Sequence, residues 1–298
     1  MYLLNTFIAL KAVSAMFKKI ITLLVLLVAS PRTSGFTIHS RSLPSSSHLY
    51  SAAPSDVASD SDPLPMESMD NPERDEIKRK LLLLCASYDR GFGASKKARD
   101  QVDDLIQQLE LANPTPVDAS RGVDGNGSST PDEGPPPLEG IWRMVWTTAL
   151  DVLSLAASPI ATPGAIYQVI EPPIATNIID FIPRAQNLLP SAFPTSLIRA
   201  EVKTRASIRP DNSNRVGLNF EAVKVVPVEV LGMKADFLPP LSINLPGSQI
   251  KIEDLPGVDP ATAPGYFDVV YLDNDVLVIR QNAPGGYFVS VKVDDCDP

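Results

Sequence analysis

Apolar and polar residues alternate along much of the second half of the chain. The pattern begins with Trp142, Met144 and Trp146 on one side, separated by residues that fall on the other side. A period of two is typical of a β-strand that buries one face. Comparable stretches, each bounded by turn residues or prolines, lie at residues 165–170, 177–181, 199–209, 216–222, 266–272, 276–281 and 287–293. About eight strands joined by hairpin turns predict a mainly β fold, either an up-and-down antiparallel barrel or a sandwich.

A helical period precedes the strands. Apolar residues recur at intervals of three and four over residues 77–88 and again over residues 98–109. Ser95 stands where its hydroxyl can cap the second helix. The pattern predicts a two-helix hairpin over residues 73–112, ahead of the barrel.

Composition divides the remainder of the chain. Residues 113–137 are rich in Gly, Ser, Asp and Pro, which predicts a flexible linker. The barrel is then expected over residues 138–293, followed by a short tail at residues 294–298.

The first 72 residues have the composition of a presequence. Met16, an alternative start, is followed by two lysines and an apolar run of about ten residues, which predicts a signal peptide ending near residue 35. Phe36 opens a Ser-rich segment to residue 54 that has Arg, His and no acid, as in plastid transit peptides. Residues 55–72 are expected to be a disordered spacer. Together they resemble the bipartite presequence of algae with secondary plastids, and they predict a plastid location; the alternative is simple secretion.

Charge and histidine usage exclude several classes of function. Residues 1–54 hold five of the 26 basic residues and none of the 35 acidic ones, so the remainder has a net charge of −14. A body this acidic repels phosphate backbones, which excludes nucleic acid as a partner. The two histidines, His39 and His48, lie in the presequence, so the mature chain has no imidazole for catalysis or zinc binding. We therefore expect no enzyme activity, no metal site and no cofactor.

Several motifs together resemble one family. The motifs are Lys80-Leu-Leu-Leu-Leu, Asp89-Arg-Gly91, Leu109-Glu-Leu-Ala-Asn-Pro-Thr-Pro116, Leu138-Glu-Gly-Ile-Trp-Arg143, Thr147-Thr148, Gln168, Asn177, Tyr271-Leu-Asp-Asn-Asp-Val-Leu-Val-Ile-Arg280 and Gly286-Tyr-Phe-Val-Ser-Val-Lys292. In this order and spacing they resemble the plastid lipid-associated protein (fibrillin) family over about residues 75–293. The resemblance implies a lipocalin-like barrel without catalytic activity, located at thylakoids and plastoglobules and connected with carotenoids and prenylquinones. One departure is that Val278 and Ile279 precede Arg280 where the family tends to have a further arginine, which leaves the subfamily open.

The lipocalin likeness also suggests roles for individual residues. Gly140 and Trp142 form the Gly-x-Trp that opens such barrels, and Arg280 is expected to pack over the Trp142 ring and close one end. The inward positions of the alternating strands are expected to line the interior and to contact an apolar ligand; they are Met144, Trp146, Val202, Thr204, Val216, Leu218 and Phe220. Small residues at inward positions of the central hairpin favour a cavity over a solid core; they are Ala200, Thr204, Ala206 and Ala222.

Two further features have competing interpretations. Asp273 and Asp275 could suggest a cation site, but in a short turn they are expected to accept hydrogen bonds from backbone amides. The apolar segments at residues 150–160 and 238–245 could rim the barrel mouth and contact lipid, or could pack under the helical hairpin. The sequence favours neither.

These observations lead to two hypotheses of different kinds. The first is a plastid protein that binds a prenylquinone, carotenoid or other lipid in its barrel, or coats plastoglobule or thylakoid surfaces. The second is a non-catalytic accessory protein that supports an enzyme of prenylquinone biosynthesis, with the helical hairpin as its docking face.

Overall fold

The computed structural model describes residues 72–112, 118–126, 134–188, 194–209, 212–244, 265–282 and 285–296. The predicted signal peptide, transit-like segment and nearly all of the spacer lie outside the described residues. None of the helices in the described ranges is long and apolar enough to cross a bilayer.

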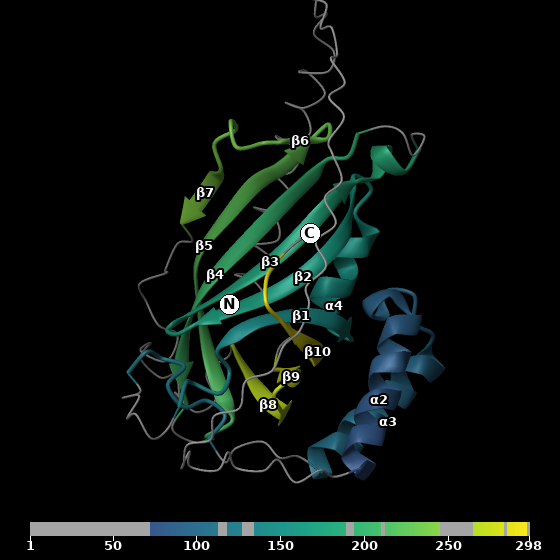
Figure 1. Cartoon of the computed structure of the whole chain (residues 1–298), viewed down its shortest axis with the longest axis vertical. Coiled ribbons are helices and arrows are strands. Elements are labelled where there is room, and N and C mark those ends of the chain that lie inside the picture. The colour runs from purple at the N-terminus through teal and green to yellow at the C-terminus, as the bar shows by residue number, and fades with distance from the viewer. Residues whose placement is uncertain are drawn as a thin grey trace, which may run out of the picture.

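Eight antiparallel strands form a closed barrel (Figure 1). They are β1 (Gly140–Thr147), β2 (Ala161–Glu171), β3 (Ile174–Pro183), β4 (Leu197–Ile208), β5 (Arg215–Val230), β8 (Tyr266–Leu272), β9 (Val276–Gln281) and β10 (Gly286–Val293). Each strand pairs with its neighbour in the chain, and β10 returns to pair with β1, so the sheet closes. The predicted barrel, with its up-and-down order, is confirmed.

The barrel is least extensively paired between β5 and β8. This ladder holds only the three residues from Arg215 to Gly217 against Tyr266 to Asp268. The rest of β5 continues past β8 and pairs instead with β7 (Leu241–Asn244) and β6 (Met233–Lys234). The second half of β5 therefore carries a small extension beyond the barrel, which periodicity did not predict.

The predicted helical hairpin is also confirmed. It consists of α2 (Pro72–Ser87), a 3₁₀ turn η1 (Asp89–Gly91) and α3 (Lys96–Leu111). Ser95 caps α3 as expected, since its Oγ accepts a hydrogen bond from the backbone N–H of Ala98. In Figure 1 the hairpin lies beside the lower part of the barrel, near β9 and β10.

The apolar faces of both helices are buried against the outer surface of the barrel. They share one core with side chains of β1, β8, β9 and β10; its fully buried members include Leu81, Val102, Ile106, Leu109, Trp146, Tyr271, Val278 and Val289. Helices this short are marginal alone, so this shared core is what holds them.

Asp273 adds a polar link between the hairpin and the barrel. Its Oδ1 accepts from the backbone N–H groups of Asp275 and Val276, as expected for a turn, and its Oδ2 accepts from Tyr271 Oη and Lys78 Nζ. Lys78, on α2, also pairs with Asp275 at 3.3 Å. The two carboxylates therefore serve the turn and the helix.

The two ends of the barrel differ. At one end, residues 118–126 pack inward from the region predicted as linker, and Ala119 and Val123 join Leu138 and Trp142 in a buried core. Across the other end run α4 (Leu150–Leu153) and the 3₁₀ turn η2 (Ser154–Ala157), between β1 and β2. The guanidinium of Arg184, in η3 (Arg184–Leu188), donates to the carbonyl oxygens of Ala156 and Ser158 and fixes this crossing. One end is filled by the chain and the other is covered by a short segment.

Candidate ligand-binding site

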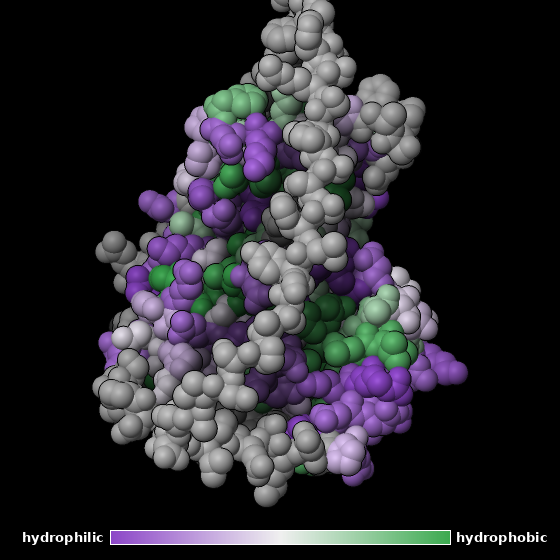
Figure 2. All heavy atoms as spheres, in the orientation of Figure 1, coloured by the Kyte–Doolittle hydropathy of each residue, from purple (hydrophilic) through white to green (hydrophobic). Residues whose placement is uncertain are grey.

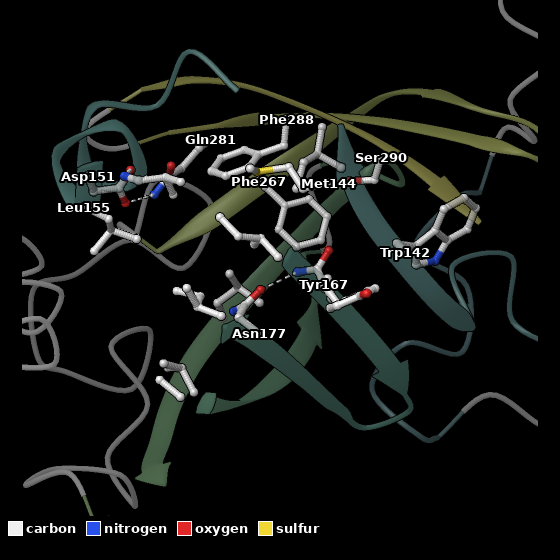
Figure 3. A pocket seen from close by; sticks show the side chains of 18 of the residues that line it. Trp142, Met144, Asp151, Leu155, Tyr167, Asn177, Phe267, Gln281, Phe288 and Ser290 are labelled. Carbon is white, nitrogen blue, oxygen red and sulfur yellow. Dashed lines mark hydrogen bonds between the residues drawn. The ribbon is translucent and has the colours of Figure 1, made fainter. Parts of the chain in front are cut away.

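The interior of the barrel contains a cavity of about 180 Å³. Every strand of the barrel contributes to its wall, and α4 and η2 contribute Asp151, Val152 and Leu155. Figure 3 shows Trp142 at one end of the cavity and Asp151 with Leu155 at the other. Most of the wall is apolar, and Met144, Phe267 and Phe288 lie between these two ends (Figure 3).

Besides Ser290 and two tyrosines, hydrogen-bonded pairs of polar side chains line the cavity at two places. Near its middle, Gln168 Nε2 donates to Asn177 Oδ1 over 3.2 Å. At the α4 end, Gln281 Nε2 donates to Asp151 Oδ2 over 3.3 Å. Burial raises the pKa of Asp151 above its ordinary value, although hydrogen bonds from Gln281 and the Val152 backbone oppose the shift. The site is thus an apolar chamber with an amide pair in its wall and a buried carboxyl group near its covered end.

Four of the seven residues expected to line the interior do so: Met144, Val202, Leu218 and Phe220. Val216 is buried in the core that fills the opposite end, beside Trp142. Thr204 is fully buried, and its hydroxyl donates to the carbonyl oxygen of Ala175. These two positions face inward but belong to the filled part of the barrel.

Trp146 lies outside the barrel interior, and its predicted place there was wrong. The pairing of β1 with β10 shifts between Met144 and Trp146, so Val145 is an extra residue that opposes no partner. Such a bulge reverses the alternation of faces beyond it. Trp146 consequently points outward into the core under the helical hairpin, where it is 0% exposed and meets Tyr88 edge-on at 6.5 Å between ring centroids.

A second bulge changes the inward face of β5. Lys203 pairs with Ala222 but Thr204 pairs with Phe220, so Glu221 is the extra residue. Val223 and not Ala222 is therefore fully buried, packed against Val202 and Phe220. The expected cavity is present, but of the small residues from which it was predicted only Ala200 lines it.

The cation over Trp142 is Lys292 and not Arg280. Lys292 Nζ lies 5.3 Å from the Trp142 ring centroid, and Trp142 Nε1 donates to the carbonyl oxygen of Leu138 over 2.9 Å. Arg280 faces outward, has a side chain 47% exposed and lies 3.6 Å from Asp268. Gly140 fits this arrangement because it has a φ of +134°, and a Cβ there would lie 2.7 Å from Lys292 Cε.

Several lining residues were not predicted as site residues. Asp151 was hidden in a segment described only as apolar, although a lone acid among leucines is itself a signal of a special environment. Gln168 and Asn177 were named only as part of the family resemblance. Amides are unusual at inward positions of a barrel, so the polar side chains themselves are a signal of a binding site. Residues 150–160 rim the barrel mouth, since Leu155 packs across that end of the barrel and not under the helical hairpin.

The chain is similar to known proteins of one family. The model of the PAP_fibrillin family matches residues 75–290. The plastid-lipid-associated protein, chloroplastic, of Citrus unshiu is 28% identical over 245 residues, which cover 74% of this chain and 68% of that protein. The probable plastid-lipid-associated protein 2, chloroplastic, of Arabidopsis thaliana is 28% identical over 258 residues, covering 74% of this chain and 71% of that protein. Plastoglobulin-1, chloroplastic, of Pisum sativum is 24% identical over 244 residues, covering 72% of this chain and 60% of that protein.

No solved structure matches the chain. All three relatives are named as chloroplast proteins, in agreement with the plastid location that the presequence predicts, and none is named as an enzyme. Since the family model covers well over half of the chain, the protein belongs to the PAP_fibrillin family of plastid lipid-associated proteins.

Proposed function

We propose that this plastid protein is a non-catalytic lipid-binding protein that holds the ring of a prenylquinone, carotenoid or other apolar lipid inside its barrel. The observation that carries the proposal is the interior cavity of about 180 Å³ with a mostly apolar wall. Dry apolar cavities of about 150 Å³ accept benzene, so this one has room for a ring. The chain of a long lipid would extend beyond it, toward α4. The names of the relatives support an association with plastid lipids.

An exposed apolar corner supports a second part of the proposal, contact with a lipid surface. Four large apolar side chains lie within residues 231–241, each between 41% and 62% exposed: Leu231, Met233, Phe237 and Leu241. Leu231 stands at the tip of the β5–β6 hairpin with a φ of 52°, a conformation that leucine rarely adopts. In Figure 2 hydrophobic spheres are visible at the top of the molecule, where Figure 1 shows the segment around β6. Clustered exposed apolar residues mark interaction surfaces, and a plastoglobule or thylakoid surface would cover these.

The cavity can be tested by filling it. Val202 lines the cavity from β4, whereas the next residue, Lys203, is exposed on the other face. We expect Val202→Trp to lose most of the binding of decylplastoquinone measured by equilibrium dialysis, and Lys203→Trp to retain it. Equal binding by the two variants, both folded by circular dichroism, would show that the quinone binds elsewhere.

The apolar corner can be tested by flotation. We expect the protein to float with trioleoylglycerol droplets coated with galactolipid, and the Met233→Gln/Phe237→Gln variant to remain in solution. Leu111→Gln provides the control, because Leu111 is 89% exposed at the end of α3, away from the corner. Flotation that is lost with Leu111→Gln and kept by the double variant would assign lipid contact to the helices.

The alternative of an accessory protein for a prenylquinone enzyme finds less support. The apolar stripes of α2 and α3 are covered by the barrel, so an enzyme docking there would meet their outer face. That face carries exposed ion pairs such as Arg79 with Glu76 and Lys96 with Asp100. Retention of such an enzyme by the chain, abolished by charge reversal at these pairs, would favour the alternative.

A further inference from the structure

Four neighbouring strands place a row of inward side chains across the cavity wall. Trp142 pairs with Gln168, Gln168 with Asn177, and Asn177 with Val202. All four side chains line the cavity. By this register an aromatic ring and an aliphatic side chain flank a pair of amides in the cavity wall. Figure 3 shows Asn177 with the hydrogen bond to its partner, and Trp142 further along the wall.

The two amides use only part of their hydrogen-bonding capacity on each other. Gln168 Nε2 donates to Asn177 Oδ1 over 3.2 Å, and the described part of the chain offers neither side chain another partner. Gln168 Oε1 and the Asn177 amide nitrogen are left as a free acceptor and a free donor group. Exchanging the oxygen and nitrogen of both amides reverses the direction of the bond but leaves the same two kinds of group.

Both side chains are half-buried and open to the cavity, so a molecule in the cavity can reach the free groups. An apolar occupant would leave them without a partner, which costs binding free energy. Leucine or methionine would fill the same volume without that cost, as Met144, Leu218 and Ile279 do on β1, β5 and β9. The pair is therefore best accounted for by a ligand that presents oxygen at this point of the wall.

We infer that the Gln168–Asn177 pair selects ring lipids that carry oxygen on the ring, such as a quinone carbonyl or a ring hydroxyl, over hydrocarbons of the same size. The oxygenated ring enters the chamber first and lies between Trp142 and Val202, and its chain extends toward α4. A carbonyl accepts from the free amide N–H, and a hydroxyl also donates to the free amide oxygen. This inference rests on the proposed binding function, because it assigns the head group of the same ligand.

The test uses two probes with the same decyl chain, one on a dimethylated quinone ring with two carbonyl oxygens and the other on a plain benzene ring. Decylplastoquinone and decylbenzene are compared on the full chain, the first by fluorescence quenching and the second by competition against it. We expect the wild type to prefer the quinone by about tenfold or more, the effect of one good hydrogen bond. In Gln168→Met/Asn177→Leu that preference should fall to less than about threefold, with the affinity for decylbenzene unchanged or increased.

The outcomes separate this inference from the proposed function. If the wild type binds neither probe, the proposed function fails. If it binds both equally, or if a folded double variant keeps the full preference, the amide pair does not select oxygen and the inference is wrong. Loss of the preference in Gln281→Met, with the double variant unaffected, would also overturn it by placing the head group at the α4 end, where Gln281 meets Asp151.

Discussion

Replacement of Asp273 should loosen the helical hairpin from the barrel. Its carboxylate accepts four hydrogen bonds: from Tyr271 Oη at 2.6 Å, Lys78 Nζ at 2.9 Å, and the backbone N–H groups of Asp275 and Val276 at 2.8 and 2.7 Å. The Lys78 and Asp273 side chains are only 19% and 14% exposed, so solvent screens this pair less than a surface pair.

The magnitude follows from what each substitution removes. Asp273→Ala deletes all four hydrogen bonds. A neutral hydrogen bond contributes a net stabilisation of about 0.5–1.5 kcal/mol and a charged one more, so we expect the free energy of unfolding to fall by about 3–4 kcal/mol. Asp273→Asn keeps an oxygen for the backbone amides and loses the attraction to Lys78, so it should cost about 2 kcal/mol. Lys78→Met, combined with Asp273→Asn in a double-mutant cycle, should give a coupling energy of about 1–2 kcal/mol.

The same group gives the stability a defined pH dependence. Burial alone would raise the pKa of Asp273, but hydrogen bonds from Tyr271, Lys78 and the backbone outweigh it and lower the pKa below the ordinary value. Its contribution is therefore present above the unfolded pKa of about 4 and is lost as the pH falls through the folded value. The stability difference between wild type and Asp273→Asn should shrink below about pH 4.

Urea unfolding at neutral and acidic pH, followed by far-ultraviolet circular dichroism, measures these quantities. A loss below about 1 kcal/mol for Asp273→Ala, or a coupling energy near zero, would refute the view that Asp273 ties α2 to the barrel.

Two further stability predictions use matched controls, and urea unfolding measures both. Gly91 has a φ of +93°, and a Cβ there would lie 2.4 Å from a backbone oxygen of β1, so Gly91→Ala should lower the free energy of unfolding by at least about 2 kcal/mol. Gly93→Ala is the control: a Cβ there would have no neighbour closer than 3.9 Å, and the loss should be below about 1 kcal/mol. Equal losses in the two variants would contradict the close approach at Gly91. Arg199→Met leaves the carboxylate of Asp180, which is 1% exposed, without its ion pair, and should lower the free energy of unfolding by about 3–5 kcal/mol. Arg205→Met is the control, because it removes only an exposed ion pair and should cost less than about 1 kcal/mol. A small effect of Arg199→Met would contradict the burial of the pair.

The strands and helices could be predicted because their patterns are local. The predicted bounds of residues 266–272 and 276–281 coincide with β8 and β9, since each apolar run there is ended by turn residues. The hairpin of α2 and α3 followed in the same way from two apolar stripes and the cap at Ser95. The pairing of the last strand with the first, β10 with β1, joins strands that are distant in the chain without a hairpin turn, and the up-and-down order of the strands predicts this pairing.

The face of a residue could not be predicted beyond a bulge. Strict alternation placed Trp146 with Trp142, but the extra residue at Val145 reverses the faces, and nothing in the local sequence announces it. The same limit applies to Ala222 after the bulge at Glu221. Because of one inserted residue, Trp146, the largest of the expected ligand contacts, lies at the helix interface and not in the interior.

Contacts between distant segments were the other limit. Lys292 and Arg280 are both cations on late strands, and only the register of β10 against β1, which pairs Lys292 with Trp142, decides which one covers the ring. The packing of residues 118–126 into the barrel end likewise depends on Ala119 and Val123 finding partners from several strands. A Gly- and Ser-rich composition does not reveal such partners.

The most direct test of lipid binding in the barrel uses the two tryptophans one at a time. Trp142 lines the cavity, and Trp146 lies outside it under the hairpin. With decylplastoquinone as the titrant, the Trp146→Phe variant, which keeps Trp142, should show saturable quenching of its fluorescence. The Trp142→Phe variant should show much weaker quenching at the same occupancy. Saturable quenching confined to Trp146, or no saturable quenching in either variant, would contradict a ligand site inside the barrel.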